Sequence, residues 1–367
     1  MKTALISGAS VAGPALAYWL KQSGWGVTVV ERAAELRPGG QAVDIRGVAL
    51  DVVSRMGLLE KAGALRTRLK GMSILDSEGN EIHRSEERTL SGGRFDSGDI
   101  EIFRDDLANL LHGLTRDEVA YQFDDSIAAL EQRGDAVDVR FQSGRSESYD
   151  LVIGADGLRS NVRRLVFGGD ELFLRSLGAQ VAIFSVDNFL ELKDWQVAFR
   201  GDNSGFLIFP ARDNQTLRVF FGFEGKEEAE RLAISQQKAL VRERCGGMGW
   251  KVPALLEAMH DASDFYLSSI SQVHMQKWSQ AHVVLLGDAG YCPSPMSGQG
   301  TSLALVGAYV LAREIERARD NYTTAFSAYE ARMRPYVELN QALATENPQG
   351  EVSDEALTRA KNAIALD

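Results

Sequence analysis

The chain has few of the residues that build disulfide frameworks or metal centres. It holds two cysteines, Cys245 and Cys292, and 5 histidines among 367 residues. Neither cysteine belongs to a CxxC or Cys/His ligand pattern, so the sequence argues against a disulfide scaffold and predicts no metal site. A reducing compartment fits this cysteine usage best, and the predicted location is the cytoplasm.

Positive charge and long apolar runs are also scarce. The 40 Lys and Arg residues face 51 Asp and Glu residues, and the resulting net charge of -11 disfavours nucleic acid or an anionic membrane as a partner. No run of about 18 apolar residues is present, so no integral membrane segment is expected. The remaining composition, 44% apolar and 25% charged, is that of a globular chain long enough for two or more domains.

The N-terminal stretch reads as a strand, a turn, a helix and a second strand. An apolar run ends at Gly8, a glycine-rich turn reaches Gly13, and the second strand closes at Glu31. In a dinucleotide-binding fold the glycines bring the pyrophosphate to the helix N-terminus, and the acid binds a ribose hydroxyl. Ser10 replaces the second glycine of the GxGxxG pattern, and its hydroxyl is able to donate to phosphate. FAD and NAD both remain compatible with these residues.

Two later strands also end in an acid beside a glycine. One apolar run ends at Asp156-Gly157, and another ends at Gly287-Asp288. Ligands bind at the carboxyl ends of parallel strands, so both acids are candidate cofactor contacts. A proline-rich loop and then Gly298-Gln299-Gly300 follow the second run and open a long helix, whose free amides can stabilise an anion.

Two arginines lie close to these motifs in the predicted fold. Arg46 follows a glycine-punctuated loop that also holds Gln41 and Asp44, and Arg104 begins a helix after an apolar strand. Both could reach a bound cofactor. Equally, Arg46 could pair with Asp44 on the surface, and Arg104 could be an ordinary helix-start residue.

The middle of the chain changes to strand-rich sequence. Alternating segments between residues 178 and 264 predict an antiparallel sheet with one helix over residues 227–245, and residues 72–83 predict a hairpin. Phe206, Phe209 and Phe221 could line an apolar pocket there. Alternating phenylalanines are more often ordinary core, and this interpretation is favoured for any single one.

Taken in order, these motifs resemble those of class A single-component FAD monooxygenases, the aromatic hydroxylase group. The resemblance rests on the glycine fingerprint with Glu31, on Asp156-Gly157, and on Gly287-Asp288 with Pro295 and the Gly298 turn. It covers essentially the whole chain. Residues 17–21, 39–47 and 287–295 are similar to the corresponding sequence segments of tetracycline destructases within that group.

The resemblance implies an α/β fold in which a Rossmann-like FAD-binding domain is interleaved with an antiparallel-sheet substrate domain. The expected FAD-binding parts are residues 1–70, 100–170 and 271–312. The expected substrate-domain parts are residues 71–99 and 171–270, and C-terminal helices over residues 313–367 would close the pocket.

It also implies the site residues. Arg46, Pro295 and Gly298 would lie near the flavin ring, and no side chain is assigned as a general acid or base. The full set expected to hold FAD is Gly8, Ser10, Val11, Ala12, Gly13, Glu31, Arg32, Arg46, Arg104, Asp156, Gly287, Asp288, Pro295, Gly298, Gln299 and Gly300. The set expected to meet substrate is Gln41, Phe206, Phe209, Phe221 and Pro293.

The activity implied is insertion of one oxygen atom from O2 into a polycyclic phenolic or enolic substrate through a flavin C4a-hydroperoxide. NADPH would reduce the flavin transiently, and a tetracycline is one candidate substrate. Another aromatic polyketide or a small phenol is the alternative substrate, and a drug-sequestering flavoprotein without turnover is the alternative of another class. Flavin halogenases are disfavoured because residues 205–210 read GFLIFP where those enzymes carry WxWxIP. A monomer or weak dimer is expected.

Overall fold

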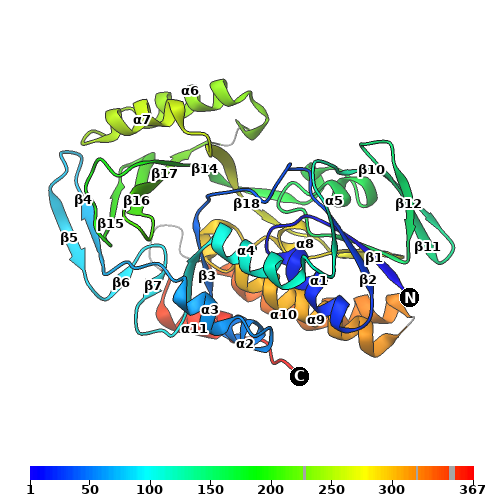
Figure 1. Cartoon of the computed structure of the whole chain (residues 1–367). Helices are drawn as coiled ribbons and strands as arrows, with labels where there is room; N and C mark the ends of the chain where they lie inside the picture. Colours follow the sequence, from blue (N-terminus) through cyan, green and yellow to red (C-terminus); the bar gives the residue numbers. More distant parts are fainter. Residues whose placement is uncertain (226–228, 320, 347–351) are drawn as a thin grey trace.

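A computed structural model describes residues 1–225, 229–319, 321–346 and 352–367. Figure 1 shows a six-stranded sheet with its helices in one half of the molecule and a seven-stranded sheet capped by two helices in the other. This arrangement confirms the interleaved α/β fold that the sequence predicts. None of the helices in the described ranges is long and apolar enough to cross a membrane.

The six-stranded sheet contains the predicted dinucleotide-binding strands. Its order is β19-β20-β13-β1-β2-β9, and every pairing is parallel except that of β19 with β20. The central strand β1 is buried because helices or strands cover both faces, as is usual for parallel sheets. The strand bounds are β1 Thr3–Ser7, β2 Gly26–Val30, β9 Ala120–Gln122, β13 Leu151–Gly154, β19 Ser279–Gln280 and β20 Val283–Leu285.

Helices and a small sheet cover these strands. Helix α1 packs against β2 and lies between α4 and α9, while a three-stranded antiparallel sheet contacts β1 and β13. The helix bounds are α1 Ala12–Gln22, α4 Arg104–Thr115, α5 Asn161–Val166, α8 Asp288–Tyr291 and α9 Gly300–Ala318. The small sheet comprises β10 Ile127–Arg133, β11 Ala136–Phe141 and β12 Ser146–Tyr149.

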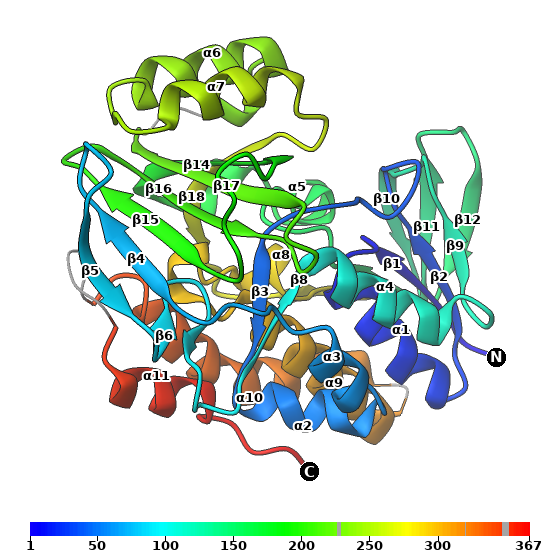
Figure 2. The same cartoon turned by 60° about the vertical axis from the view of Figure 1, so that its left-hand side comes forward.

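The seven-stranded sheet forms the second body. Its order is β18-β14-β17-β16-β15-β4-β5, with antiparallel pairings except between β15 and β4. Figure 2 shows α6 and α7 lying across one face of it, where they enclose a separate hydrophobic core. The bounds are β4 Met72–Leu75, β5 Glu81–Ser85, β14 Leu174–Asp187, β15 Gln196–Arg200, β16 Ser204–Pro210, β17 Thr216–Glu224, β18 Tyr266–Val273, α6 Ile234–Cys245 and α7 Val252–Asp261.

Short elements join the two bodies. Strand β3 pairs with β8 in an antiparallel ribbon, and α2 and α3 follow β3. The bounds are β3 Ala42–Ile45, β8 Ile100–Phe103, α2 Val48–Arg55, α3 Leu59–Ala64, β6 Arg88–Thr89 and β7 Gly93–Arg94. The 3-10 turns are η1 Asp170–Leu172, η2 Ala229–Arg231 and η3 Pro295–Ser297.

The C-terminal helices differ in part from the predicted boundaries. Helix α9 runs across residues 312 and 313, and α10 (Tyr322–Ala342) packs along it. Helix α11 (Asp354–Lys361) reaches the residue before β8 of the β3–β8 ribbon, where Lys361 pairs with Asp99 at 2.7 Å. The helix expected over residues 227–245 is α6, which begins only at Ile234, and residue 227 lies outside the described ranges. Helix α7 was not predicted.

Two glycines should respond in opposite directions to the same substitution. A Cβ on Gly13 would lie 1.9 Å from the Gly8 carbonyl oxygen, whereas a Cβ on Gly63 in α3 would meet no heavy atom within 4 Å. We therefore expect Gly13→Ala to lower the free energy of unfolding by about 1–3 kcal/mol through forced backbone movement. Gly63→Ala should raise it by about 0.5–1 kcal/mol, because alanine is the better helix former.

Denaturant titration of the two purified variants beside the wild type measures both changes. Equal stability of the Gly13 variant and the wild type would contradict the close approach of α1 to the turn after β1.

Candidate functional site

The turn after β1 is shaped by backbone contact. Gly8 has a φ of 109°, and a Cβ there would lie 2.4 Å from the Ala155 carbonyl oxygen. Only glycine fits such an approach without movement. The residue before α1 is Val11, whose side chain accepts no hydrogen bond from the helix, so the first amides of α1 are open to an anion.

Glu31 and two arginines border a small crevice beside this turn. Glu31 accepts hydrogen bonds from the backbone N–H groups of Ala9 (2.9 Å) and Ala33 (3.0 Å). The crevice is also lined by Ser10, Arg37 and Arg104. These groups are suited to hold a ribose and a pyrophosphate, which need acceptors and cations respectively.

The loop between β2 and β3 holds the Arg104 side chain in place. Its Nη2 donates to the carbonyl oxygens of Arg37 (2.8 Å) and Gly39 (2.6 Å). Burial, and then the nearby charge of Arg37, lower the pKa of Arg104. Sequence reasoning named Arg32 as a cofactor contact and did not single out Arg37. Both side chains are exposed in the structure, and Arg37 is the one that lines the crevice.

Asp288 lies where β20 meets the N-terminal ends of two helices. Gly287, with a φ of 64°, fits between α1 and α9, since its Cβ would be 3.3 Å from the Ala12 Cβ and 3.5 Å from the Ala304 Cβ. A Cβ on Gly300 would lie 3.6 Å from Asp288 Oδ1. Burial raises the pKa of Asp288, and a hydrogen bond with Cys292 lowers it in part. The structure therefore brings the first and third predicted motifs together.

The start of α9 holds a buried amide without a partner. Gln299 has no exposed surface, and neither its Oε1 nor its Nε2 has a hydrogen-bond partner among the described residues. Gly298 before it is left-handed, with a φ of 63°. Leaving such an amide unpaired is costly, so this position fits a ligand with both donor and acceptor groups, as a flavin ring has.

Arg46 lies directly beside Gly298. A Cβ on Gly298 would be 3.3 Å from Arg46 Nη1, and Arg46 Nη2 pairs with Asp44 at 2.8 Å. Both charged residues are buried. The sequence left two alternatives for Arg46, a contact with the cofactor or a surface pair with Asp44. The pair with Asp44 is present, but it lies in the interior beside the α9 turn and not on the surface.

The cluster around Arg46 contains a second carboxylate, so it has more acidic than basic groups. Glu101 on β8 is the cross-strand partner of Asp44 on β3, so the two side chains lie on the same face of the ribbon. Asp44 Oδ1 and Glu101 Oε1 are both shielded and lack hydrogen-bond partners in the described ranges. Burial is the largest cause that raises the pKa of Asp44, to about 7, and the charge of Glu101 adds to it. Burial also raises the pKa of Glu101.

Asp156 caps a helix. Its carboxylate accepts hydrogen bonds from the Ser160 hydroxyl (2.5 Å) and from the backbone N–H groups of Asn161 (2.8 Å) and Val162 (3.1 Å) at the start of α5. Burial raises its pKa, while these hydrogen bonds act in the opposite direction. Asp156 therefore fixes α5 to the end of β13, and a cofactor would be positioned by it only indirectly.

The predicted substrate phenylalanines lie on opposite faces of the seven-stranded sheet. Phe206 and Phe221 belong to the core under α6 and α7, where Phe206 stacks on Trp250 with centroids 5.3 Å apart. Phe209 faces the other way and stacks on Phe103 beside the ribbon at 6.3 Å. Phe206 and Phe221 are thus packing residues of the outer core, and we correct the prediction that all three line one pocket.

The inner sheet face also carries polar groups that the sequence did not single out. Ser185 and Arg218 are cross-strand partners, and Arg218 is also the partner of Phe209, so the three share this face. Arg218 pairs with Asp264 at 3.2 Å beside Gly39. A polar residue within a strand carries no local signal of its tertiary neighbours, and this explains the omission.

Gln196 links that face to the charge cluster. It is fully buried, accepts from the Leu90 backbone N–H (2.8 Å) and donates to the Ser91 hydroxyl (2.7 Å). The Ser91 carbonyl oxygen accepts from Arg46 at 3.2 Å. A path of buried and partly buried polar groups therefore runs from the seven-stranded sheet to the α9 turn.

The remaining predicted residues are spread around this region. Val11 and Ala12 are buried at the start of α1, and the Gln41 carbonyl oxygen accepts from the Arg104 backbone N–H at 3.0 Å. Pro293 is buried and its carbonyl oxygen accepts from Gln272, whereas Pro295 is exposed at the first position of η3. No group of three metal-ligating side chains was found among the residues that the structure describes.

The glycine turn, the acid after β2 and the unpaired amide at α9 are together suited to a dinucleotide cofactor. A family model described as a FAD binding domain matches residues 1–340. The chain belongs to this family of FAD-dependent monooxygenases.

Relatives of known sequence support the membership. An uncharacterized protein of Mycobacterium tuberculosis is 48% identical over 369 residues, which is 100% of this chain and 99% of that protein. A flavin-dependent monooxygenase of Legionella longbeachae is 39% identical over 338 residues, which is 92% of this chain and 86% of that protein.

Solved structures agree over the full length. The crystal structure of tetracycline destructase Tet(51) superposes with a TM-score of 0.90 at 37% identity, covering 100% of this chain and 99% of that one. Tet(55) gives a TM-score of 0.89, also at 37% identity, with 100% and 98% covered. The resemblance seen in the sequence is thereby confirmed.

The unbalanced cluster predicts an unusual stabilising substitution. A raised Asp44 pKa means that the folded state keeps a proton that the unfolded state releases between about pH 4 and 7, so this carboxyl lowers stability as pH rises through that window. Glu101→Gln removes the neighbouring like charge, and the amide oxygen can still accept from Thr67. We expect the free energy of unfolding at pH 8 to rise by about 1 kcal/mol, with little change at pH 5.

Denaturant titrations of the flavin-loaded protein at both pH values measure the effect. The matched control is Glu338→Gln, an exposed position on α10. A variant that loses stability at pH 8 would show that the two carboxylates do not oppose each other.

Proposed function

We propose that this FAD-dependent monooxygenase uses NADPH as its electron donor and inserts one oxygen atom into a polycyclic phenol or enol, with a tetracycline as the first candidate. The observation that carries the proposal is the meeting of Arg46 and Gly298 at the start of α9. The loop that ends at Arg46 is one of the stretches most similar to tetracycline destructases, and full-length likeness to Tet(51) supports the same choice.

Bound FAD would supply the redox chemistry and the activation of O2. In this proposal Ser10, Arg37 and Arg104 hold the pyrophosphate, and Glu31 and Asp288 accept from sugar and ribityl hydroxyls. The N-terminus of the long helix α9 favours an anion and would stabilise negative charge on the ring. Gly300 N–H is the proposed donor, because Gly298 N–H donates to the Pro295 carbonyl oxygen (3.1 Å) and Gln299 N–H donates to the Ser297 hydroxyl (3.1 Å). NADPH would bind only transiently, since the sequence has no second glycine fingerprint.

The rest of the chain would position substrate and exclude water. Phe209 is fully buried on the inner sheet face, where it stacks on Phe103, and it would support the wall of the pocket from behind. The polar groups beside it suit the polar edge of a fused-ring phenol. Gln41 and Pro293 are proposed as further contacts. A smaller phenol or another polyketide fits the same chemistry. Turnover of any of these substrates would distinguish an enzyme from a flavoprotein that only sequesters a drug.

Removing the acid after β20 should weaken FAD binding. Asp288→Asn keeps the size of the side chain but removes the charged acceptor, and we expect about a tenfold rise in the FAD dissociation constant. Flavin fluorescence after equilibrium dialysis measures the constant. Asp51→Asn, an exposed change on α2, is the control. Unchanged FAD affinity in the Asp288 variant would remove this residue from the cofactor site.

A tetracycline should accelerate NADPH oxidation and gain mass consistent with oxygen insertion. Phe209→Leu is expected to raise the KM for that substrate several-fold, whereas Phe206→Leu should change stability alone because its ring lies under α7. NADPH absorbance and product mass spectrometry supply the readouts. Stimulation by simple phenols but not by tetracyclines would leave the monooxygenase in place and reject the proposed substrate.

A further inference from the structure

Two carboxylates lie opposite each other on the β3–β8 ribbon. Asp44 on β3 and Glu101 on β8 are direct partners in the antiparallel pairing, which brings their Cβ atoms to about 4.5–5.5 Å. Asp44 Oδ1 and Glu101 Oε1 are shielded from solvent, and neither has a hydrogen-bond partner in the part of the chain that the structure describes. Since an ionised carboxylate only accepts, a proton on either carboxyl would add a donor that this pair lacks.

The acids of this pair outnumber the cation beside them. Arg46 Nη2 pairs with Asp44 at 2.8 Å, and its charge also acts on Glu101. Asp99, a third acid near the pair, is already paired with Lys361 at 2.7 Å. With every group charged, Asp44, Glu101 and Arg46 therefore carry one net negative charge, and a single proton on the pair would remove it.

Thr67 connects the pair to the protein surface. Its hydroxyl donates to Glu101 Oε2 at 2.5 Å, and both residues are partly exposed. On the other side, a Cβ on Gly92 would lie 3.0 Å from the Glu101 carboxyl carbon, so the turn between β6 and β7 covers the carboxyl there. A proton from solvent would therefore reach the pair from the Thr67 side.

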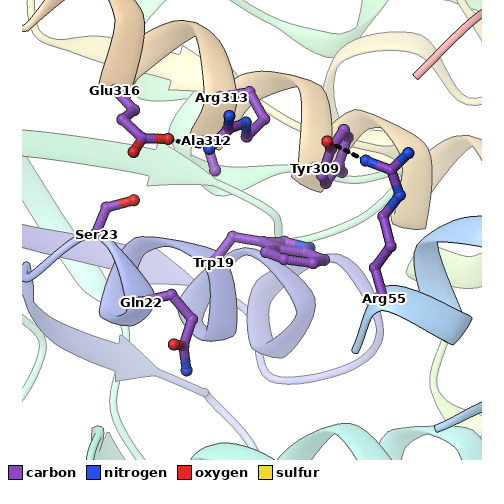
Figure 3. A pocket seen from close by; sticks show the side chains of 8 residues that line it. All are labelled: Trp19, Gln22, Ser23, Arg55, Tyr309, Ala312, Arg313 and Glu316. Carbon is purple, nitrogen blue, oxygen red and sulfur yellow. Dashed lines mark hydrogen bonds and ion pairs between the residues drawn. The ribbon is translucent and has the colours of Figure 1, made fainter. Parts of the chain in front are cut away.

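The groove between α1 and α9 shows the opposite condition. Its two guanidinium groups already have partners, since Arg55 donates to the Tyr309 hydroxyl and Arg313 pairs with Glu316 (Figure 3). Tyr309 also lies nine residues beyond Gly300 along α9, which is about 13 Å from the helix start. The ribbon, and not this groove, combines an unbalanced charge with a position at the α9 turn.

The pair lies close to the proposed position of the flavin ring. A Cβ on Gly298 would be 3.3 Å from Arg46 Nη1, and Arg46 in turn contacts Asp44. The inference below rests on the proposed function in this one respect, that the ring binds at the Gly298 turn. Burial is the main cause that raises the pKa of Asp44, to about 7, and a negative charge added nearby would raise it further.

We propose that Asp44 and Glu101 form an acid pair that takes up one proton when the flavin ring is reduced and releases it when the ring is reoxidised. The two electrons come from the donor and the proton comes from solvent past Thr67. The one bond that forms in the pair is a carboxyl O–H bond. Where reduction leaves one negative charge on the ring, this proton keeps the net charge of ring and cluster constant.

The midpoint potential of the flavin-loaded protein, measured against pH with dithionite and indicator dyes, tests the proposal. Its slope counts the protons bound on reduction. Near pH 8 we expect the wild type to bind about 0.5 proton per flavin more than the double variant Asp44→Asn, Glu101→Gln. Glu101→Gln alone removes the like charge but keeps the pair of Asp44 with Arg46, so it should move this uptake to lower pH.

Glu314→Gln is the matched control, because Glu314 is a buried carboxylate that pairs with two arginines on the far half of α9 and its own helix neighbour. Its slope should equal that of the wild type. Equal slopes for the wild type, the double variant and Glu101→Gln would overturn the assignment. If the double variant loses its flavin, Glu101→Gln decides, since Arg46 remains paired in it.

The test separates the acid pair from the proposed function. Dithionite replaces NADPH, and no substrate is present. A slope difference in a protein that does not oxidise NADPH would keep the acid pair and reject the proposed donor. Equal slopes in a protein that turns over with NADPH would do the reverse.

Discussion

The close approach of α1 to the turn after β1 is the constraint on which the cofactor end of the molecule depends. Gly13 lies against Gly8, and Gly8 in turn lies against Ala155 at the end of β13. This contact draws the N-terminus of α1 to the carboxyl edge of the sheet, where its open amides face any bound anion. Gly287 extends the same packing to α9, so three segments distant in sequence meet around one point.

The second feature of that point is a buried excess of negative charge. Arg46 pairs with Asp44, while Glu101 nearby feels only the charge of that arginine, and interior carboxylates without full pairing are costly. A bound ligand or a proton that pairs with these carboxylates would reduce the free-energy cost of burying them. The unpaired side-chain amide of Gln299 lies in the same region. Unsatisfied groups collected at one end of α9 support the proposed position of the cofactor, since a bound ligand would supply their partners.

The two sheets contribute in different ways. The parallel strands of the six-stranded sheet hold the strand ends that carry the predicted cofactor residues. The antiparallel sheet divides its side chains between a closed core under α6 and α7 and an inner face toward the ribbon. Because side chains alternate along a strand, Phe206 and Phe209, three residues apart on β16, cannot line the same cavity. The odd spacing of these two phenylalanines is visible in the sequence itself.

Glycine positions and strand-end acids predicted a dinucleotide cofactor, because they are local requirements of such a fold, and the family resemblance narrowed that cofactor to FAD. Tertiary structure decided which of the candidate side chains meet. Arg37, Arg218 and Gln196 carry no local signal, Asp156 accepts hydrogen bonds from the start of α5, and Arg32 does not line the crevice that Arg37 borders. Contacts between distant segments depend on how whole sheets and helices pack, and no short stretch of sequence encodes that packing alone.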